Sequence, residues 1–154
     1  MISIINGPNL NMLGKRNPGV YGNKTFEQFL PEAEELTRRL SDGNENLRYF
    51  QSNSEGELVS EIQRLAFDPD CHGIVINPGA YAHYSYAIRD ALEMVTAPVI
   101  VVHISNIHAR DEFRHKDVTA PVSRGCICGL GLDGYLLALR HLMVLRQDTH
   151  KLTS

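Results

Sequence analysis

Five short apolar runs, separated by amphipathic segments, constrain most strongly how this chain can fold. The runs are rich in isoleucine and valine, are bounded by asparagine, glycine or proline, and cover residues 2–5, 47–50, 73–76, 99–102 and 125–128. Short runs of this kind are typical of strands that are buried on both faces of a parallel sheet. We therefore expect five buried strands.

The segments between and after these runs carry helical spacing. In the first segment, apolar residues recur at helical intervals from Phe26 to Leu40, Thr25 is a suitable N-cap, and Asp42-Gly43 is a stop signal. Further helices are expected at residues 54–66, 84–95 and 133–145.

Strand and helix thus alternate along the whole chain. This alternation predicts an α/β fold with a flavodoxin-like, doubly wound sheet of five parallel strands and helices on both faces. In such sheets ligands bind beyond the carboxyl ends of the strands, where the strand order reverses. No internal repeat or linker interrupts the chain, so we expect one catalytic domain that spans residues 1–154.

The composition and charge argue against several classes of protein. Hydrophobic residues make up 43% of the chain and charged residues 21%, which is ordinary for a globular protein. The net charge of -3 does not favour nucleic acid as a partner. The N-terminus lacks the cationic and apolar regions of a secretory signal, and no apolar stretch reaches the length of a membrane span. We expect a cytoplasmic protein without membrane contact.

The cysteines and histidines do not form a recognisable metal motif. The three cysteines are Cys71, Cys126 and Cys128, an odd number that does not support a disulfide framework. A single Cys-x-Cys pair does not by itself indicate zinc, because alternation along a strand gives the same spacing. The seven histidines lack an HExxH pattern. We expect neither a metal nor a cofactor.

Polar residues gather directly after three of the predicted strands. NGPNLNMLG follows the first strand, NPGAYAHYS the third and HISNIHARDEFRH the fourth. All three stretches belong at the predicted ligand-binding edge of the sheet. The first stretch lacks both the P-loop and the dinucleotide-binding pattern, so a phosphate, flavin or nucleotide site is not favoured.

The loop GKRNPGVYG, residues 14–22, allows two interpretations. Glycine at both ends and proline in the middle indicate a loop rather than a strand or helix. Taken alone, it is typical of a surface turn in which Arg16 is solvated and Tyr21 anchors the turn. Taken with the polar stretches, it is a mobile lid that brings Arg16 and Tyr21 over a substrate.

Three separated motifs and the end of the chain resemble one family. The motifs read NGPNLNxLGxRxPxxYG, INPGAYxHYSxAxRDAL and VHISNxxARxEFR, and GLGLDGYLLALRHL follows them. In this order and spacing they resemble type II 3-dehydroquinate dehydratase over nearly the whole chain. The resemblance implies a flavodoxin-like fold and anti elimination of water from 3-dehydroquinate to 3-dehydroshikimate, through an enolate and without a metal or covalent intermediate. It also implies a homododecamer assembled from trimers.

The resemblance assigns roles in the reaction to four residues. Tyr21 matches the base that removes a proton beside the ketone, and Arg16 supplies the positive charge that favours its phenolate. Asn9 matches the position that holds a water near the ketone oxygen, where the enolate charge develops. His103 matches the acid that protonates the leaving hydroxide, and imidazole is suited to that task near neutral pH.

Five further residues match positions at which the family binds the substrate. Asn77 and His83 match positions that hold the ring hydroxyls. Ile104 and Ser105 match the pair whose backbone and side chain bind the carboxylate. Arg114 matches a further contact from the cationic segment after the fourth strand.

Asp90 has two interpretations. Its place on a predicted helix is typical of a solvated charge. The resemblance instead matches it to a carboxylate that one subunit supplies to the loop and substrate region of its neighbour. Its role therefore depends on the assembly.

Two positions depart from the family pattern. Asn17 stands where the family usually has glutamate after the loop arginine, and we expect a small effect. Val101 stands where the family usually has the glutamate of VEVHIS. Positions 101 and 103 share a face of a strand, so a carboxylate at 101 could orient the imidazole of His103. We expect a reduced rate, and we expect Val101→Glu to raise turnover.

Val101 also supports a second functional hypothesis. In it, the chain is a low-activity or non-catalytic homologue that keeps a dehydroquinate-shaped pocket. The presence together of Tyr21, Arg16, Asn9 and His103 favours the enzyme. The same elimination would serve either aromatic amino acid biosynthesis or quinate breakdown.

Overall fold

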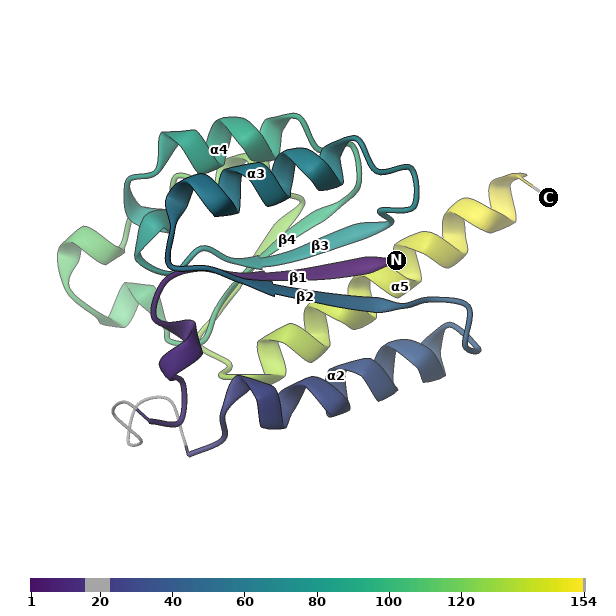
Figure 1. Cartoon of the computed structure of the whole chain (residues 1–154), viewed down its shortest axis with the longest axis horizontal. Helices are drawn as coiled ribbons and strands as arrows, with labels where there is room; N and C mark the ends of the chain where they lie inside the picture. The colour runs from purple at the N-terminus through teal and green to yellow at the C-terminus, as the bar shows by residue number, and fades with distance from the viewer. Residues whose placement is uncertain (16–22, 154) are drawn as a thin grey trace.

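Five strands form one sheet in which every neighbouring pair is parallel (Figure 1). The computed structural model describes residues 1–15 and 23–153. The strands are β1 (Ile2–Asn6), β2 (Leu47–Gln51), β3 (Gly73–Asn77), β4 (Val99–His103) and β5 (Gly125–Cys128). Their order across the sheet is β2-β1-β3-β4-β5. This order confirms the predicted flavodoxin-like, doubly wound sheet, in which the direction of winding reverses between β1 and β3.

Helices cover both faces of this sheet (Figure 1). The long helices are α2 (Phe26–Leu40), α3 (Glu55–Ala66), α4 (Tyr86–Glu93) and α5 (Asp133–Thr153). α2 and α5 lie on one face, and α3 and α4 lie on the other. Thr25 caps α2 as predicted, because its Oγ1 accepts a hydrogen bond from the N–H of Gln28. Within the described part of the chain, no helix combines the length and the apolar character needed to cross a membrane.

Short 3-10 helices follow three of the strands and gather at one end of the sheet. They are η1 (Leu10–Met12), η2 (Gly79–His83), η3 (Ile107–Ala109), η4 (Glu112–Arg114) and η5 (Ala120–Val122). η1 follows β1, η2 follows β3, and the other three follow β4. Figure 1 shows η1 and the segment after β4 beyond the carboxyl ends of the strands. The polar stretches of the sequence therefore meet at one edge.

Two apolar layers hold the helices onto the sheet. Alternation along β4 sends Ile100 and Val102 to the layer beneath α2 and α5, and Val99 and Val101 to the layer beneath α3 and α4. The central strands β1, β3 and β4 are buried along their whole length, as predicted. The prediction of full burial was wrong for β2 and β5, which are partly exposed. These two are edge strands, and an edge strand has a neighbour on one side only.

Four strands run one residue farther than the apolar pattern predicts, and each then ends in a polar residue. These residues are Asn6, Gln51, Asn77 and His103. Backbone pairing decides where a strand ends, and in this register Asn6 lies opposite both Gln51 and Asn77. The helix ends differ as well, since α4 is shorter and α5 longer than predicted.

The loops after β1 and β3 cross at very short distance. The N–H of Gly7 donates to the carbonyl of Asn77 at 2.8 Å. A Cβ on Gly7 would lie 2.4 Å from the carbonyl oxygen of Pro78, so only glycine permits this approach. The crossing ties the first and second sequence motifs together at the edge of the sheet.

We expect Gly7→Ala to lower the free energy of unfolding by about 1–3 kcal/mol, because backbone atoms of Pro78 must move to admit the methyl group. The matched control is Gly56→Ala in α3, where a Cβ would meet only the Ser54 hydroxyl, 3.9 Å away. That control should raise the free energy of unfolding by about 0.5–1 kcal/mol. Urea denaturation measures both, and equal effects would contradict the steric argument.

Candidate active site

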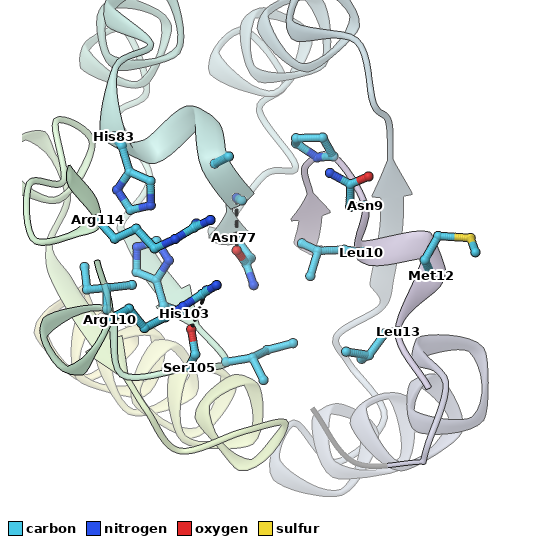
Figure 2. Close-up of a pocket in the computed structure, with 15 residues that line it drawn as sticks. Asn9, Leu10, Met12, Leu13, Asn77, His83, His103, Ser105, Arg110 and Arg114 are labelled. Atoms are coloured by element: carbon cyan, nitrogen blue, oxygen red, sulfur yellow. Dashed lines mark hydrogen bonds between the residues drawn. The ribbon is translucent and has the colours of Figure 1, made fainter. Parts of the chain in front are cut away.

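A pocket of about 230 Å³ opens beyond the carboxyl ends of β1, β3 and β4 (Figure 2). Its wall is built from the three polar stretches that lie far apart in the sequence. The lining residues are Pro8, Asn9, Leu10, Met12, Leu13, Asn77, Gly79, Ala80, His83, His103, Ile104, Ser105, Ile107, Arg110 and Arg114. The pocket adjoins the reversal of winding between β1 and β3, which is where a sheet of this type binds ligands.

His103 is the last residue of β4 and is almost fully buried. Its Nε2 lies 2.7 Å from Oδ2 of Asp117, and the two side chains are only 6% and 7% exposed. The ring of His103 also stacks on that of His83, with centroids 6.3 Å apart and planes inclined by 12°. These contacts fix the plane of the imidazole at the wall of the pocket.

Asp117 is held from its other side by three donors. Its Oδ1 accepts hydrogen bonds from the N–H and Oγ1–H of Thr119, at 2.8 and 2.7 Å, and from the N–H of Ala120 at 3.0 Å. Burial by itself raises the pKa of a carboxyl, but the hydrogen bonds from His103 and Thr119 outweigh burial and lower the pKa of Asp117. Asp117 is therefore an anion at neutral pH.

Asn77 is oriented by a buried hydrogen-bond bridge. Its Nδ2 donates to Oη of Tyr135 at 3.0 Å, and the Tyr135 hydroxyl donates to Oδ1 of Asn6 at 2.8 Å. Oδ1 of Asn77 accepts the N–H of Gly79 at 3.1 Å. Tyr135 is completely buried, and burial raises the pKa of its hydroxyl, so it remains neutral. The bridge links the ends of β1 and β3 to α5.

His83 and Asn9 stand at opposite sides of the pocket (Figure 2). Nδ1 of His83 lies 2.8 Å from the carbonyl of Lys116, and because a carbonyl only accepts, Nδ1 carries the proton. Asn9 is in the left-handed region with a φ of 67°, and its N–H donates to Oδ1 of Asn53 at 2.9 Å. Both residues are thus positioned by contacts outside the pocket.

The pocket is cationic although the chain carries a net charge of -3. Arg110 and Arg114 both reach into it, and no aspartate or glutamate is among the described residues that line it (Figure 2). Nη1 of Arg110 donates to Oγ of Ser105 at 3.2 Å. Nε of Arg114 is buried, donates to no hydrogen-bond acceptor among the described residues, and lies 3.7 Å from Oδ2 of Asp111. The arrangement suits a small anionic ligand.

Two thiols lie beside His103 on the neighbouring strand β5. The Sγ atoms of Cys126 and Cys128 are 3.4 Å apart, and with a ring nitrogen of His103 they lie within 4.8 Å of one another. Burial raises the pKa of both thiols, so both are neutral at neutral pH. Asp117 already contacts Nε2 of the histidine. Cys126 and Cys128 are alternate residues of β5, which accounts for the Cys-x-Cys spacing, but the sequence did not indicate that they lie close to His103.

Most of the predicted site residues meet in this pocket. Those that line it are Asn9, Asn77, His83, His103, Ile104, Ser105 and Arg114. Asp90 is exposed on α4 and does not line the pocket of its own chain. Arg16 and Tyr21, with most of the predicted lid, lie outside the described residues.

Sequence reasoning missed two residues. Arg110 belongs to the third motif and lines the pocket, but it was given no role. Asp117 lies three residues beyond that motif, in a stretch without a pattern of its own. Its position against His103 depends on how the segment after β4 folds back. No signal in the sequence marks that contact.

Comparison with known proteins agrees with this geometry. The model of the family described as dehydroquinase class II matches residues 1–143. The chain belongs to this family. A 3-dehydroquinate dehydratase from Thermotoga neapolitana is 53% identical over 148 residues, which are 96% of this chain and 97% of that protein.

Solved structures of the class II dehydroquinase family share the fold. The type II dehydroquinase from Propionibacterium acnes has a TM-score of 0.87 and 44% identity, over 93% of this chain and 95% of that chain. The type II dehydroquinase from Butyrivibrio crossotus has a TM-score of 0.84 and 48% identity, over 92% of this chain and 95% of that chain. The flavodoxin-like architecture is therefore shared over nearly the whole molecule.

We expect Tyr135→Phe to lower the free energy of unfolding by about 1–3 kcal/mol, because it leaves the buried amides of Asn6 and Asn77 without their shared partner. Tyr84→Phe is the control, since Tyr84 is 58% exposed. Chemical denaturation of the two variants measures the difference. Equal stability of the two would show that the bridge contributes nothing.

Asp117 should also contribute to stability in a pH-dependent way. Its folded-state pKa lies below 3.8, so the ionised carboxylate stabilises the folded state above that pH, and the contribution is lost as the pH falls through the folded pKa. We expect Asp117→Asn to lower the free energy of unfolding by about 1–3 kcal/mol near neutral pH. Denaturation at a series of pH values should show this difference narrowing below pH 3.8; a constant difference would contradict the assignment.

Proposed function

We propose that this chain is a type II 3-dehydroquinate dehydratase. It eliminates water from 3-dehydroquinate in the anti sense, through an enolate, to give 3-dehydroshikimate in the shikimate pathway that leads to aromatic amino acids. The observation that carries the proposal is the pocket in which Asn9, Asn77, His83, His103 and the Arg110–Arg114 segment meet. Family membership agrees with it.

The substrate is a carboxylate, and the charge of the pocket supports its binding. Arg110 and Arg114 supply positive charge without a competing acidic side chain among the described lining residues. The hydroxyl of Ser105 lies beside Arg110, and the preceding residue, Ile104, also lines the pocket. We assign the carboxylate to this group and the ring hydroxyls to Asn77 and His83.

The acid step falls to His103. In the proposed elimination the electrons of the C–O bond leave with oxygen, which takes a proton from the imidazolium and departs as water. His103 is the residue at the end of β4 whose ring is held by contacts on two sides. A fixed ring reduces the cost of reaching the geometry for proton transfer.

The base step falls to Tyr21, assisted by Arg16. A free tyrosine has a pKa of about 10, so the phenolate needs a neighbouring cation to form near neutral pH. Asn9 is exposed at the opposite side of the pocket from His103, where a water held by its side chain would meet the enolate oxygen. Closure of residues 14–22 over the substrate would assemble these groups and exclude bulk water.

The assembly and location that we propose follow from the resemblance. A homododecamer built from trimers would place Asp90 of one subunit near the substrate region of the next, and its exposure on α4 is compatible with such a contact. We place the enzyme in the cytoplasm, and the 1–154 chain acts as one catalytic domain. No metal or cofactor takes part in the proposed reaction.

The rival proposal is a homologue that binds dehydroquinate without efficient chemistry. Val101 is the observation that favours it, because the carboxylate usual in the family is missing from that position. The Asp117 carboxylate beside His103 weakens this argument.

Conversion of 3-dehydroquinate, followed by ultraviolet absorbance of the conjugated enone product, tests the proposal. The unmodified protein should form product, and Tyr21→Phe should lower kcat by about a hundredfold or more. Tyr84→Phe is the control, because this exposed tyrosine does not line the pocket. Absence of product from the unmodified protein would refute the enzyme, and full activity of Tyr21→Phe would refute the base.

Substrate affinity tests the cationic wall. We expect Arg114→Gln and Arg110→Gln each to lower kcat/KM by about tenfold to a hundredfold, since each removes a charged hydrogen-bond donor. Arg38→Gln on the exposed surface of α2 is the control and should leave kcat/KM unchanged, because its partner Glu35 is also exposed and both lie outside the pocket. Unchanged kinetics in both pocket variants would place the carboxylate elsewhere.

A further inference from the structure

The face of β4 that carries His103 has no carboxylate of its own. Val101 and His103 share this face by alternation, and Val101 is completely buried in the apolar layer beneath α3 and α4. Across the register, Val101 lies opposite Cys126 and His103 lies opposite Cys128. A histidine that must donate a proton needs a partner that selects its tautomer and favours its charged form. No residue on these two strands supplies one.

Asp117 supplies this contact from a different part of the chain. It lies 14 residues beyond His103, between η4 and η5, and places Oδ2 2.7 Å from Nε2. Both side chains are more than nine-tenths buried. A hydrogen bond to a carboxylate that is this short and this well shielded from water is much stronger than an exposed one.

The carboxylate is also fixed by contacts within its own segment of the chain. Thr119 and Ala120 occupy Oδ1, which leaves Oδ2 directed at the imidazole. The lowered pKa of Asp117 keeps the carboxylate charged at neutral pH. Such an arrangement resembles the partner that orients a metal-binding histidine in other proteins, where its loss costs about tenfold to a hundredfold in metal affinity or activity.

The other ionisable groups around His103 do not offer the same contact. His83 stacks on its ring from η2, and Arg110 and Arg114 face the pocket from the segment after β4. The thiols of Cys126 and Cys128 on β5 are neutral. Among the described groups that face His103, Asp117 is the anion.

We infer that Asp117 is the positioning residue for the acid His103, and that it replaces the carboxylate missing at Val101. Oδ2 of Asp117 accepts a hydrogen bond from the N–H at Nε2, and this contact fixes the tautomer and stabilises the imidazolium. Nδ1 is then the nitrogen that gives its proton to the leaving oxygen as the C–O bond breaks, and His103 ends the step neutral with its proton on Nε2. The inference rests on the proposed role of His103.

The first test is Asp117→Asn. The amide keeps an oxygen for Thr119 and Ala120 but removes the negative charge beside His103. We expect kcat to fall about tenfold to a hundredfold with KM within about twofold, because substrate contacts remain. The alkaline limb of the kcat profile should move to lower pH, because the imidazolium loses its counter-charge. Asp68→Asn is the control, because it makes the same change beside Arg64 of α3; it should leave kcat and the pH profile of kcat unchanged.

A second readout does not depend on activity. In nitrogen-15 spectra of histidine-labelled protein without substrate, neutral His103 should carry its proton on Nε2. In Asp117→Asn the amide N–H can donate to Nε2, so the proton should move to Nδ1. If the tautomer of His103 is the same in Asp117→Asn as in the unmodified protein, the inference is overturned, whether or not the unmodified protein is active. If the tautomer changes as expected but the unmodified protein forms no product, only the proposed function is refuted.

The third test combines the two positions. With Asp117 present, Val101→Glu should not raise turnover, because it buries a second carboxylate near the first; this replaces the expectation drawn from the sequence. In the Asp117→Asn background, Val101→Glu should restore part of kcat, and Val101→Gln should not. Failure of this rescue in a folded double variant, or a gain from Val101→Glu alone, would overturn the inference.

Thr119→Val covers the case in which Asp117→Asn does not fold. It removes one donor to Oδ1 but leaves the carboxylate in place. We expect a smaller decrease in kcat with the same direction of change in the pH profile. An unchanged kcat and pH profile would count against Asp117 as the positioning residue.

Discussion

Parallel pairing of the five strands is the constraint on which the rest of this molecule depends. It brings the carboxyl end of every strand to one edge, so residues that are 70 or more positions apart in the sequence line one pocket. The close crossing of Gly7 and Pro78 and the buried Tyr135 bridge then lock the ends of β1 and β3 together. These contacts hold the side chains at the ends of β1 and β3 at fixed distances from one another.

The pocket shows how a site can oppose the charge of the whole chain. The chain is acidic overall, but the segment after β4 turns two arginines inward and keeps acidic side chains away from the lining. Inside such a pocket a cation attracts an anionic ligand more strongly than it would in bulk water, because less solvent screens it. The carboxylate of Asp117 lies behind His103, accepts hydrogen bonds from Thr119 and Ala120, and is not among the described residues that line the pocket.

The relation between Val101 and Asp117 shows where sequence reasoning stopped. From the sequence, an apolar residue at position 101 predicts the loss of a partner for His103, because alternation locates only residues on the same strand face. The structure supplies a partner from the loop that folds over the end of β4. A histidine can therefore have the same function whether its carboxylate partner is on the same strand or on another element of the fold.

The sequence by itself determined the strands, the helices, the parallel sheet and the edge at which the polar residues meet. These follow from apolar periodicity and capping residues, which act over a few neighbouring positions. Only the tertiary structure decided that Asp117 contacts His103, that Tyr135 orients Asn77, and that two thiols lie beside the acid. The physical reason is that these contacts join segments without periodicity, whose paths are set by packing on the finished sheet.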